Sequence, residues 1–276
     1  MKISDWMHTA KKQLVNSDKP KRDLEILLGM VTGKSRAWLM AYDDSTLTTC
    51  ALMTLTNLVE RRAIGEPMAY LIGEREFWSL PLKVTPDTMI PRPDTEIVVE
   101  QTLIRMTNAS CSILDLGTGS GAIALAIASE RKNCHVLGID CIRSVIDLAK
   151  YNALKLGINN ASFRLGRWFS TIQDQKFAII VSNPPYIDIS DLHLLEGDLR
   201  FEPKSALISG NHGLADIALI IAEAGKHLIH GGWLLLEHGW QQGNIIRHMM
   251  RKYGFVNIKT AQDYGGHERV TLGRYR

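Results

Sequence analysis

Apolar residues in the first quarter of the chain recur with the spacing of one helix face. Two sets of leucine and valine residues share this spacing of three and four positions, and they are Leu24, Leu27, Leu28, Val31 and Leu52, Leu55, Leu58, Val59. Pro20 stands where a helix would begin, while Gly65, Pro67 and Gly73 interrupt the pattern. We therefore predict a small helical bundle in a domain over residues 1–72.

The pattern then changes to alternation. Residues 76–80 and 82–85 flank Pro81 and predict a β-hairpin, which we place as a linker over residues 73–90. From Ser112 onward, strand-like stretches alternate with helix-like ones. The predicted strands are Ile113–Leu116, His135–Ile139, Ser162–Leu165, Phe177–Ser182, Trp233–Glu237, Phe255–Thr260 and Arg269–Leu272. The predicted helices are Ala122–Arg131, Arg143–Leu156 and Leu214–Ile229.

This order predicts an α/β fold with a largely parallel, doubly wound sheet in a domain over residues 91–276. The link between the last two strands contains residues 261–267 and no helical pattern. Because a parallel crossover needs a dozen or more residues, these two strands are expected to pair antiparallel.

Composition limits the classes of protein without choosing a function. The 276 residues are 45% hydrophobic and 22% charged, close to the average for a folded globular protein. No apolar run reaches the roughly 18 to 20 residues of a membrane span, and Asp5 stands where a signal peptide would need its apolar core. A net charge of +3 without a dense basic run is weak support for binding nucleic acid. We expect a cytoplasmic protein that contacts neither membrane nor nucleic acid.

The four cysteines favour neither a metal site nor a set of disulfides. Cys50, Cys111, Cys134 and Cys141 form no C-x-x-C pair, and no histidine repeat beside them has the spacing of metal ligands. We expect reduced, mostly buried thiols and no bound metal.

A glycine-rich loop is the sharpest local signal. Asp115-Leu-Gly117-Thr118-Gly119-Ser120-Gly121 leaves a predicted strand and opens a predicted helix. Glycines let a ligand approach the backbone, and the first turn of a helix has free N–H donors. The G-x-G-x-G spacing differs from the G-x-G-x-x-G of dinucleotide folds, which disfavours a pyrophosphate ligand. A tight turn without a ligand is the alternative.

Asp140 ends the next predicted strand, beside this loop. An acid at that place can accept hydrogen bonds from both hydroxyls of a ribose. Its alternative role is to cap the helix that begins near Ile142. Together, the loop and Asp140 predict a bound nucleoside.

The fourth predicted strand runs into Asn183-Pro184-Pro185-Tyr186. Two consecutive prolines fix the backbone and remove two N–H donors. The amide oxygen of Asn183 and the carbonyl of Pro184 can both accept from one planar NH2 group, with the Tyr186 ring against the same plane. Such a clamp fits an exocyclic amine or a carboxamide, whereas a proline turn that only ends the strand is the simpler alternative.

These three motifs resemble class I S-adenosylmethionine-dependent methyltransferases of amino nitrogens. Five longer runs are similar to the PrmC (HemK) family, the bacterial protein-(glutamine-N5) methyltransferases of peptide chain release factors. They are residues 75–79, 90–96, 115–124, 200–203 and 236–243. The resemblance covers nearly the whole chain.

The resemblance implies a fold, a cofactor and a partner. The fold is a seven-stranded class I (Rossmann-like) methyltransferase sheet with a small N-terminal helical domain that docks a class 1 release factor. The protein would act as a monomer. Its substrate is the glutamine of the release factor's Gly-Gly-Gln loop.

Site residues follow from the same resemblance. S-adenosylmethionine would be contacted by Gly117, Thr118, Gly119, Ser120, Gly121, Asp140, Trp168 and Asn183. The glutamine amide would be held by Asn183, Pro184, Pro185 and Tyr186, with Asn183, Pro184 and Tyr186 as the catalytic residues.

One position departs from the family pattern. The family reads Asp-Trp-Phe after strand three, where this chain has Arg167-Trp168-Phe169. An arginine cannot accept a hydrogen bond from the adenine amino group, so Arg167 is not assigned to the cofactor.

The interpretation is a methyl transfer that depends on positioning. Asn183 and Pro184 would hold the amide nitrogen in line with the methyl group and bind it more strongly as it becomes positive. The main alternative is an amino-methyltransferase of nucleic acid, because adenine N6 and guanine N2 are also planar NH2 groups. A non-catalytic cofactor-binding or adaptor protein is a second alternative, which the intact motif at Asn183–Tyr186 opposes.

Overall fold

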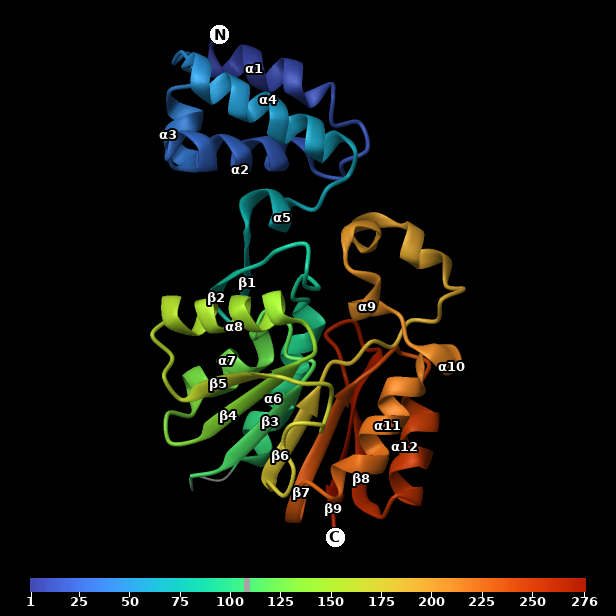
Figure 1. The fold of residues 1–276 in the computed structure, drawn as a ribbon. Helices are drawn as coiled ribbons and strands as arrows, with labels where there is room; N and C mark the ends of the chain where they lie inside the picture. The colour runs from blue at the N-terminus through green and yellow to red at the C-terminus, as the bar shows by residue number, and fades with distance from the viewer. Residues whose placement is uncertain (107–109) are drawn as a thin grey trace. The chain divides into compact units, whose positions relative to one another are not determined.

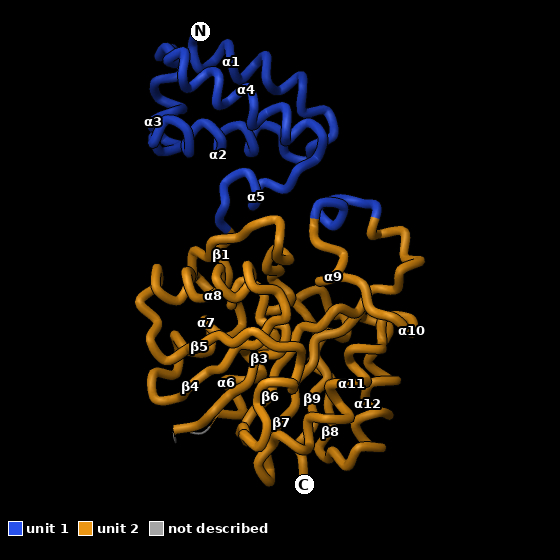
Figure 2. The backbone as a smooth tube through the Cα atoms, viewed as in Figure 1, with its two compact units in different colours: residues 1–74, 195–201 blue, residues 75–194, 202–276 orange. Residues whose placement is uncertain are grey.

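A computed structural model describes residues 1–106 and 110–276 of the chain. The chain divides into two compact units, residues 1–74 with 195–201 and residues 75–194 with 202–276 (Figure 2). No helix within the described ranges is long and apolar enough to cross a membrane.

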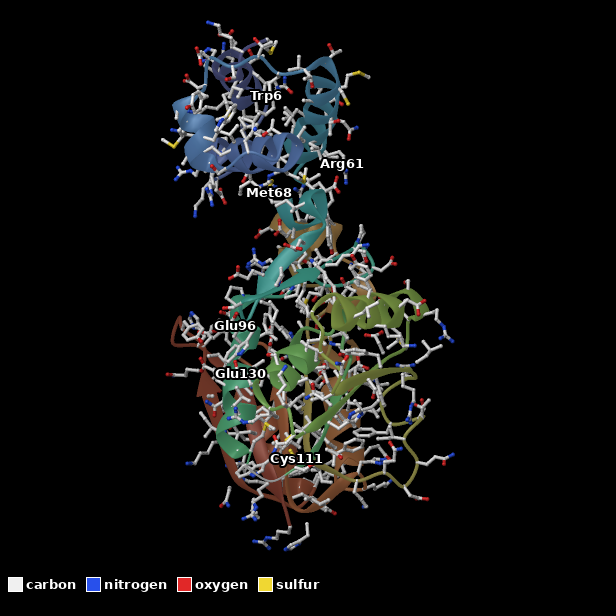
Figure 3. All side chains as sticks on the ribbon, turned by 90° about the vertical axis from the view of Figure 1, so that its left-hand side faces the viewer. Trp6, Arg61, Met68, Glu96, Cys111 and Glu130 are labelled. Carbon is white, nitrogen blue, oxygen red and sulfur yellow. The ribbon has the colours of Figure 1, made fainter. Side chains whose placement is uncertain are left out.

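The first unit is built from helices. They are α1 (Ile3–Lys11), α2 (Pro20–Thr32), α3 (Arg36–Ala41), α4 (Thr49–Ala63), α5 (Met68–Ile72) and the short η3 (Gly197–Phe201). The apolar faces of α1 to α5 meet in one core that contains Trp6, Leu24 and Leu55, and Figure 3 labels Trp6 within it. Asp23 is buried beside this core and pairs with Arg62 at 2.7 Å, so its charge is compensated. The predicted N-terminal helices are confirmed.

The second unit contains a seven-stranded sheet (Figure 1). Its strands are β3 (Ser112–Leu116), β4 (His135–Asp140), β5 (Ala161–Leu165), β6 (Phe177–Ser182), β7 (Leu228–Glu237), β8 (Phe255–Gln262) and β9 (Glu268–Tyr275). The order across the sheet is β5-β4-β3-β6-β7-β9-β8. β9 runs antiparallel to both of its neighbours, and the other pairs are parallel. The predicted α/β fold, including the antiparallel final pair, is confirmed.

Helices cover both faces of this sheet. The larger ones are α6 (Glu96–Arg105), α7 (Ala122–Glu130), α8 (Arg143–Lys155), α11 (Ala215–Ala224) and α12 (Gly243–Lys252). Side chains alternate between the faces: Ile113 packs with α6, α7 and α8, whereas Leu114 packs with α11 and α12. Short helices lie in the connections, namely η1 (Pro93–Thr95), η2 (Leu192–Leu195), α9 (Lys204–Leu207) and α10 (Gly210–Gly213).

A β-hairpin precedes the sheet, and its turn differs from the prediction. Its strands are β1 (Glu74–Phe77) and β2 (Leu80–Lys83), so Pro81 lies inside the second strand. Trp78 and Ser79 form the turn with φ of 51° and 58°, the left-handed backbone that two-residue hairpin turns require. The backbone N–H and the ring N–H of Trp78 donate to Glu96 and Glu130, each at 2.9 Å, and Figure 3 labels both acceptors.

One predicted helix is too long, and one observed helix was not predicted. The helix predicted over Leu214–Ile229 ends at Ala224, because Leu228 pairs with Phe177 as the start of β7. Helix α12 was not predicted, although Ile246 and Met250 bury one of its faces. Pairing between distant segments overrides local helix preference at the first place.

The prediction of mostly buried cysteines is wrong. Of the four, Cys134 is buried, Cys111 is partly buried, and Cys50 and Cys141 are exposed. Cys50 begins helix α4 on its solvent side, and Cys141 follows β4 beside the cavity described below.

Candidate active site

A cavity of about 550 Å³ lies at the carboxyl ends of β3, β4 and β6 in the second unit. Strand β3 has β4 on one side and β6 on the other, so the chain order reverses beside it. Loops that leave such a point diverge, and open α/β sheets bind their ligands there. The predicted residues that line the cavity are Gly117, Thr118, Gly119, Ser120, Asp140, Trp168, Asn183 and Pro185.

The glycine loop has a backbone that glycine permits. Gly117, Gly119 and Gly121 have φ of 70°, 55° and 84°, all in the left-handed region. The N–H groups of Gly117 and Thr118 both donate to the Ile139 carbonyl, at 2.9 and 3.0 Å. These bonds fasten the loop to the end of β4.

Asp115 forms the buried base of the loop. Its side chain is fully buried and accepts from the Thr118 hydroxyl at 2.7 Å. Burial raises the pKa of Asp115 to about 7. The carboxyl group therefore supports the loop from below rather than lining the cavity, and it is not among the lining residues.

Asn152 connects the hairpin to this loop. The side chain is fully buried in helix α8. Its amide accepts from the Lys83 N–H at 2.8 Å and donates to the carbonyls of Lys83 and Ser120, at 3.0 and 2.9 Å. One side chain thus satisfies polar backbone groups of β2 and of the glycine loop.

Asp140 faces the loop from the end of β4. Its two oxygens accept from the N–H groups of Gly119 and Ile142, at 3.1 and 3.2 Å. A carboxylate has about four acceptor positions, so Asp140 keeps acceptor capacity for a ligand such as a ribose. Burial raises the pKa of Asp140, and these backbone N–H groups oppose the rise. The alternative role as a helix cap is not met, because the N-cap of helix α8 is Ile142, whose own N–H donates to Asp140.

Trp168 forms another wall of the cavity. Its ring approaches Gly117, where a Cβ atom would lie 3.5 Å from Cζ3. The indole N–H is buried and has no hydrogen-bond partner within the described residues. Arg167 also lines the cavity, so the departure from the family pattern lies at the ligand space itself.

The motif Asn183–Tyr186 divides between the cavity and the protein interior. Asn183 and Pro185 line the cavity, whereas Pro184 and Tyr186 do not. The amide nitrogen of Asn183 donates to the Thr95 hydroxyl at 3.2 Å. Gly121 is also a predicted site residue that does not line the cavity. It precedes helix α7 and supports the loop.

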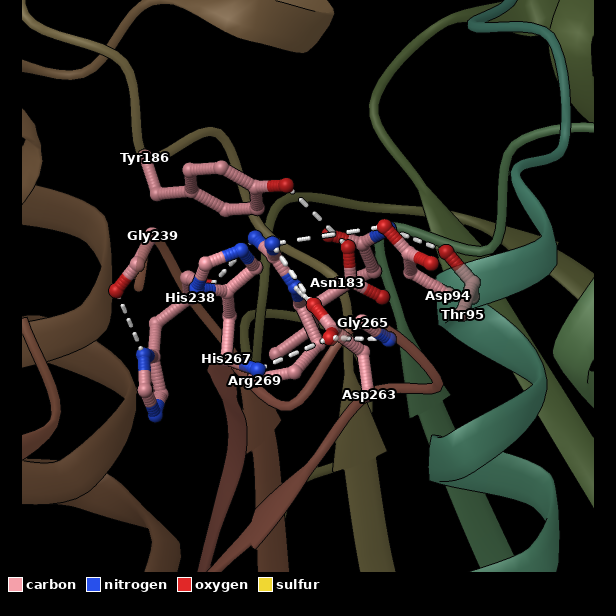
Figure 4. Close-up of polar contacts among 11 residues, drawn as sticks. Asp94, Thr95, Asn183, Tyr186, His238, Gly239, Asp263, Gly265, His267 and Arg269 are labelled. Atoms are coloured by element: carbon pink, nitrogen blue, oxygen red, sulfur yellow. Dashed lines mark hydrogen bonds and ion pairs between the residues drawn. The ribbon is translucent and has the colours of Figure 1, made fainter. Parts of the chain in front are cut away.

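Tyr186 is held by a buried polar cluster (Figure 4). Its hydroxyl donates to Glu237 at 3.1 Å, and burial raises the pKa of Glu237 to about 7. Arg269 lies beside this pair and makes two hydrogen bonds to Asp263, at 2.9 and 3.0 Å. The carboxylate of Asp263 therefore already pairs with the arginine next to Glu237.

The backbone of Tyr186 packs directly against Gly213. A Cβ atom at Gly213 would overlap the Tyr186 carbonyl oxygen, and the φ of Gly213 is +80°. Gln242 donates to the same oxygen at 3.0 Å. The end of the motif is thus fixed by a contact that only glycine permits.

His238, the residue after β7, takes part in a chain of hydrogen bonds. Its Nδ1 lies 2.8 Å from the Gly239 carbonyl, which can only accept, so Nδ1 carries the proton. Its Nε2 lies 2.7 Å from the Thr271 hydroxyl, which is 2.9 Å from Thr260, and Arg247 donates to Thr260 at 2.7 Å. Because Nε2 then carries no proton, it accepts from the Thr271 hydroxyl, and the Thr271 oxygen accepts from the Thr260 hydroxyl. Burial lowers the pKa of His238 to about 4.

Sequence reasoning missed part of the cavity wall. Thr95, at the end of η1, lines the cavity and contacts Asn183, and Pro91 precedes it on the same segment. Ser205 and Ile208 line the cavity from the connection after β6. An ion pair between Arg92 and Glu202 joins these two segments. Residues 90–96, one of the runs that resemble the family, were the available signal, although no site residue was assigned there.

Two family models match the chain, a PrmC N-terminal domain over residues 5–73 and a methyltransferase domain over residues 107–268. The release factor glutamine methyltransferase of Salmonella typhimurium is 53% identical over 275 residues, which cover 100% of this chain and 99% of that protein. The chain belongs to the release factor glutamine methyltransferase family. The same enzyme of Vibrio cholerae is 52% identical over 269 residues, covering 97% of this chain and 94% of its own. The resemblance to the PrmC family is confirmed.

Solved structures support the fold. A methyltransferase from Pyrococcus furiosus has a TM-score of 0.53 at 20% identity and covers 79% of this chain and 98% of its own. A T. thermophilus 16S rRNA methyltransferase, solved with AdoMet and guanosine, has a TM-score of 0.54 at 15% identity and covers 74% of this chain and 50% of its own. Membership of the family and this fold make the chain a methyltransferase with a class I sheet.

Proposed function

We propose that this chain transfers the methyl group of S-adenosylmethionine to the side-chain amide nitrogen of the glutamine in the Gly-Gly-Gln loop of class 1 release factors. The observation that carries the proposal is the full-length similarity, 53% over 275 residues, to a release factor glutamine methyltransferase. The cavity supports it because Asp140 and Asn183 line the same space, beside the strand β3 where the chain order of the sheet reverses.

The residues of the cavity fit S-adenosylmethionine. The three left-handed glycines expose the loop backbone, and Asp140 keeps acceptor positions for a ribose. Trp168 offers a ring and an unpaired buried N–H at the same wall. When bound, the cofactor supplies an electrophilic methyl group on a positively charged sulfur.

The chain itself contributes position and electrostatics. Asn183 lines the cavity with its amide nitrogen turned to Thr95, so its amide oxygen is left to accept from the glutamine NH2 group. We assign the Pro184 carbonyl as the second acceptor of the substrate NH2 group. The Tyr186 ring is assigned to pack against the plane of the substrate amide. Both acceptors bind more strongly as the nitrogen becomes positive, which lowers the barrier without a catalytic base. The proton then leaves to water.

The same proposal covers the remaining assignments. Residues 1–72 dock the release factor, residues 73–90 form the connecting hairpin, and residues 91–276 carry the chemistry. The enzyme acts as a monomer in the cytoplasm, where release factors work, and makes no direct contact with nucleic acid. The model for the N-terminal domain, matched over residues 5–73, supports the first boundary.

One labelling experiment tests the proposed function. The protein is incubated with methyl-labelled S-adenosylmethionine and, in separate tubes, a release factor, the same factor with its loop glutamine replaced, and total nucleic acid. Label in the first tube alone is expected. Label in the nucleic acid tube would instead support the amino-methyltransferase of nucleic acid, and no label at all would support a non-catalytic protein.

A further inference from the structure

A buried carboxylate lies directly behind the motif that holds the glutamine amide. Glu237 ends β7 and is only 2% exposed. Figure 4 shows Tyr186, Asn183 and Thr95 gathered around one polar cluster with Arg269. The methyl transfer described above uses no carboxylate, so the cluster needs another explanation.

The first connection runs from Glu237 to Tyr186, the last residue of the motif. The phenol hydroxyl donates to Oε1 of Glu237 at 3.1 Å. Burial raises the pKa of Tyr186 above its ordinary value, so the phenol remains a donor. The position of the Tyr186 ring is therefore tied to an acceptor at the end of β7.

The second connection runs through Thr95 to Asn183. The amide nitrogen of Asn183 donates to the Thr95 oxygen at 3.2 Å. The Thr95 hydroxyl lies next to the Glu237 carboxylate and opposes the rise of its pKa. A hydroxyl has one proton, and an ionised carboxylate can only accept. An ionised Glu237 can therefore accept a hydrogen bond from the Thr95 hydroxyl, which leaves the Thr95 oxygen as an acceptor for the Asn183 nitrogen. The Asn183 amide oxygen then faces away from Thr95.

We propose that Glu237 is a positioning residue, whose ionised carboxylate sets the direction of the Thr95 hydroxyl and so presents the Asn183 amide oxygen to the substrate NH2 group. The inference rests on the proposed function, since it concerns the same clamp. When Glu237 is protonated, it can donate a hydrogen bond as well as accept one. The Thr95 hydroxyl then no longer has to donate to Glu237. The clamp then loses its fixed direction, while the cavity and its cofactor contacts remain.

The groups around Glu237 give it a pKa at which its protonation can be followed near neutral pH. Tyr186 faces Glu237 from the loop after β6, Asp94 from η1, and Arg269 from β9. Arg269 already pairs with Asp263, which lies in the turn between β8 and β9. His238 follows it in the chain, directly after β7. Burial raises the pKa of Glu237 to about 7 despite the nearby arginine. The ionised form, which sets the direction, is therefore gained as pH rises through about 7.

The test compares Glu237→Gln with the wild type and with Glu268→Gln. Glutamine keeps the size of the side chain but replaces an acceptor oxygen with a donating NH2 group. Glu268 is a matched control, because it is also a glutamate near an arginine, pairing with Arg247 at 2.6 Å, and its hydrogen bonds within the described residues lie outside the clamp. Single-turnover methyl transfer to a release factor is measured from about pH 6 to about pH 9, together with the affinity for S-adenosylmethionine.

The wild-type rate is expected to rise with pH and to reach its midpoint near 7. Glu237→Gln should be about tenfold slower at pH 8, which is about 1.4 kcal/mol in the barrier, because the Asn183 amide is no longer held in one direction, and its profile should be flat near neutrality. Affinity for the cofactor should change by less than about twofold, since the carboxylate is not a cofactor contact. Glu268→Gln should keep the wild-type rate and profile.

A second pair of variants distinguishes the loss of the Thr95 hydroxyl from a general loss of folded structure. Thr95→Val keeps the branched shape and removes the hydroxyl, so it should lose the same rate as Glu237→Gln, whereas Thr95→Ser should recover most of it. A wild-type rate and pH profile in Glu237→Gln overturns the inference, and so does a rate loss that matches a loss of cofactor affinity. Absence of label in the wild type refutes the proposed function instead, and it is seen before any variant is compared.

Discussion

Replacing His238 with glutamine should remove a defined part of the pH dependence of stability. In the folded protein, burial lowers the pKa of His238 from 6.5 to about 4. The directional chain from Arg247 through two threonine hydroxyls presents a proton to Nε2, so a second proton there has no acceptor. The unfolded chain binds a proton below about pH 6.5, and the folded chain does so only below about pH 4.

The sign and size follow from this difference. Stability from neutral His238 is fully present above the unfolded pKa of 6.5 and is lost as pH falls toward about 4. Linkage gives a loss of about 2 kcal/mol between pH 7.5 and pH 5, and about 3 kcal/mol once both states are protonated. Urea unfolding followed by far-ultraviolet circular dichroism at these two pH values measures it.

The comparison of variants isolates this one residue. Other groups titrate equally in wild type and His238→Gln, so the difference between their two pH dependences should be about 2 kcal/mol. His248→Gln is a matched control, because His248 is exposed on α12 and its replacement leaves the buried chain intact. Equal losses in wild type and His238→Gln would refute the directional chain, since His238 would then accept a proton while folded.

Three further changes test the site. Asn183→Ala should slow single-turnover methyl transfer about tenfold or more with cofactor affinity mostly kept, because one acceptor of the amide clamp is lost; an unchanged rate contradicts the clamp. Asp140→Ala should weaken binding of S-adenosylmethionine about tenfold or more in a calorimetric titration, since charge-assisted hydrogen bonds of about 1.5–3 kcal/mol disappear, and an unaltered titration rejects the ribose role. Gly213→Ala should cost roughly 2–4 kcal/mol in urea unfolding through its overlap with the Tyr186 carbonyl, whereas Gly254→Ala, at a φ of +85° in open space, should cost only about 1 kcal/mol. Equal losses in the two glycine variants would show that backbone strain alone is responsible.

Local signals in the sequence were sufficient for most of the fold. Strands β3, β4 and β6 read as short apolar runs, and each is followed by the residue type that its loop needs, such as Gly117, Asp140 or Asn183. The cavity residues at these strand ends could be named for that reason. The turn at Trp78 and Ser79 could not, because neither residue is typical of a left-handed backbone.

The missing residues of the site depend on contacts between distant segments. Thr95 and Asn183 are 88 positions apart, and Tyr186 and Glu237 are 51 apart. Neither Thr95 nor Glu237 stands in a motif whose spacing points to the other partner, and an acid at the end of a strand more often serves packing or capping. Only the fold shows that both side chains meet behind the amide clamp.

The contacts of Asn152 bear on how this enzyme could be given a different protein substrate. Since both polar groups of Lys83 and the carbonyl of Ser120 share this one buried amide, strand β2 belongs structurally with the cofactor loop. A chimera with a foreign recognition module should therefore be joined before the hairpin, near Gly73, rather than after it. A junction at residue 90 would remove the partners of a buried side chain and disturb the loop that it supports, so the cut would cost catalysis as well as recognition.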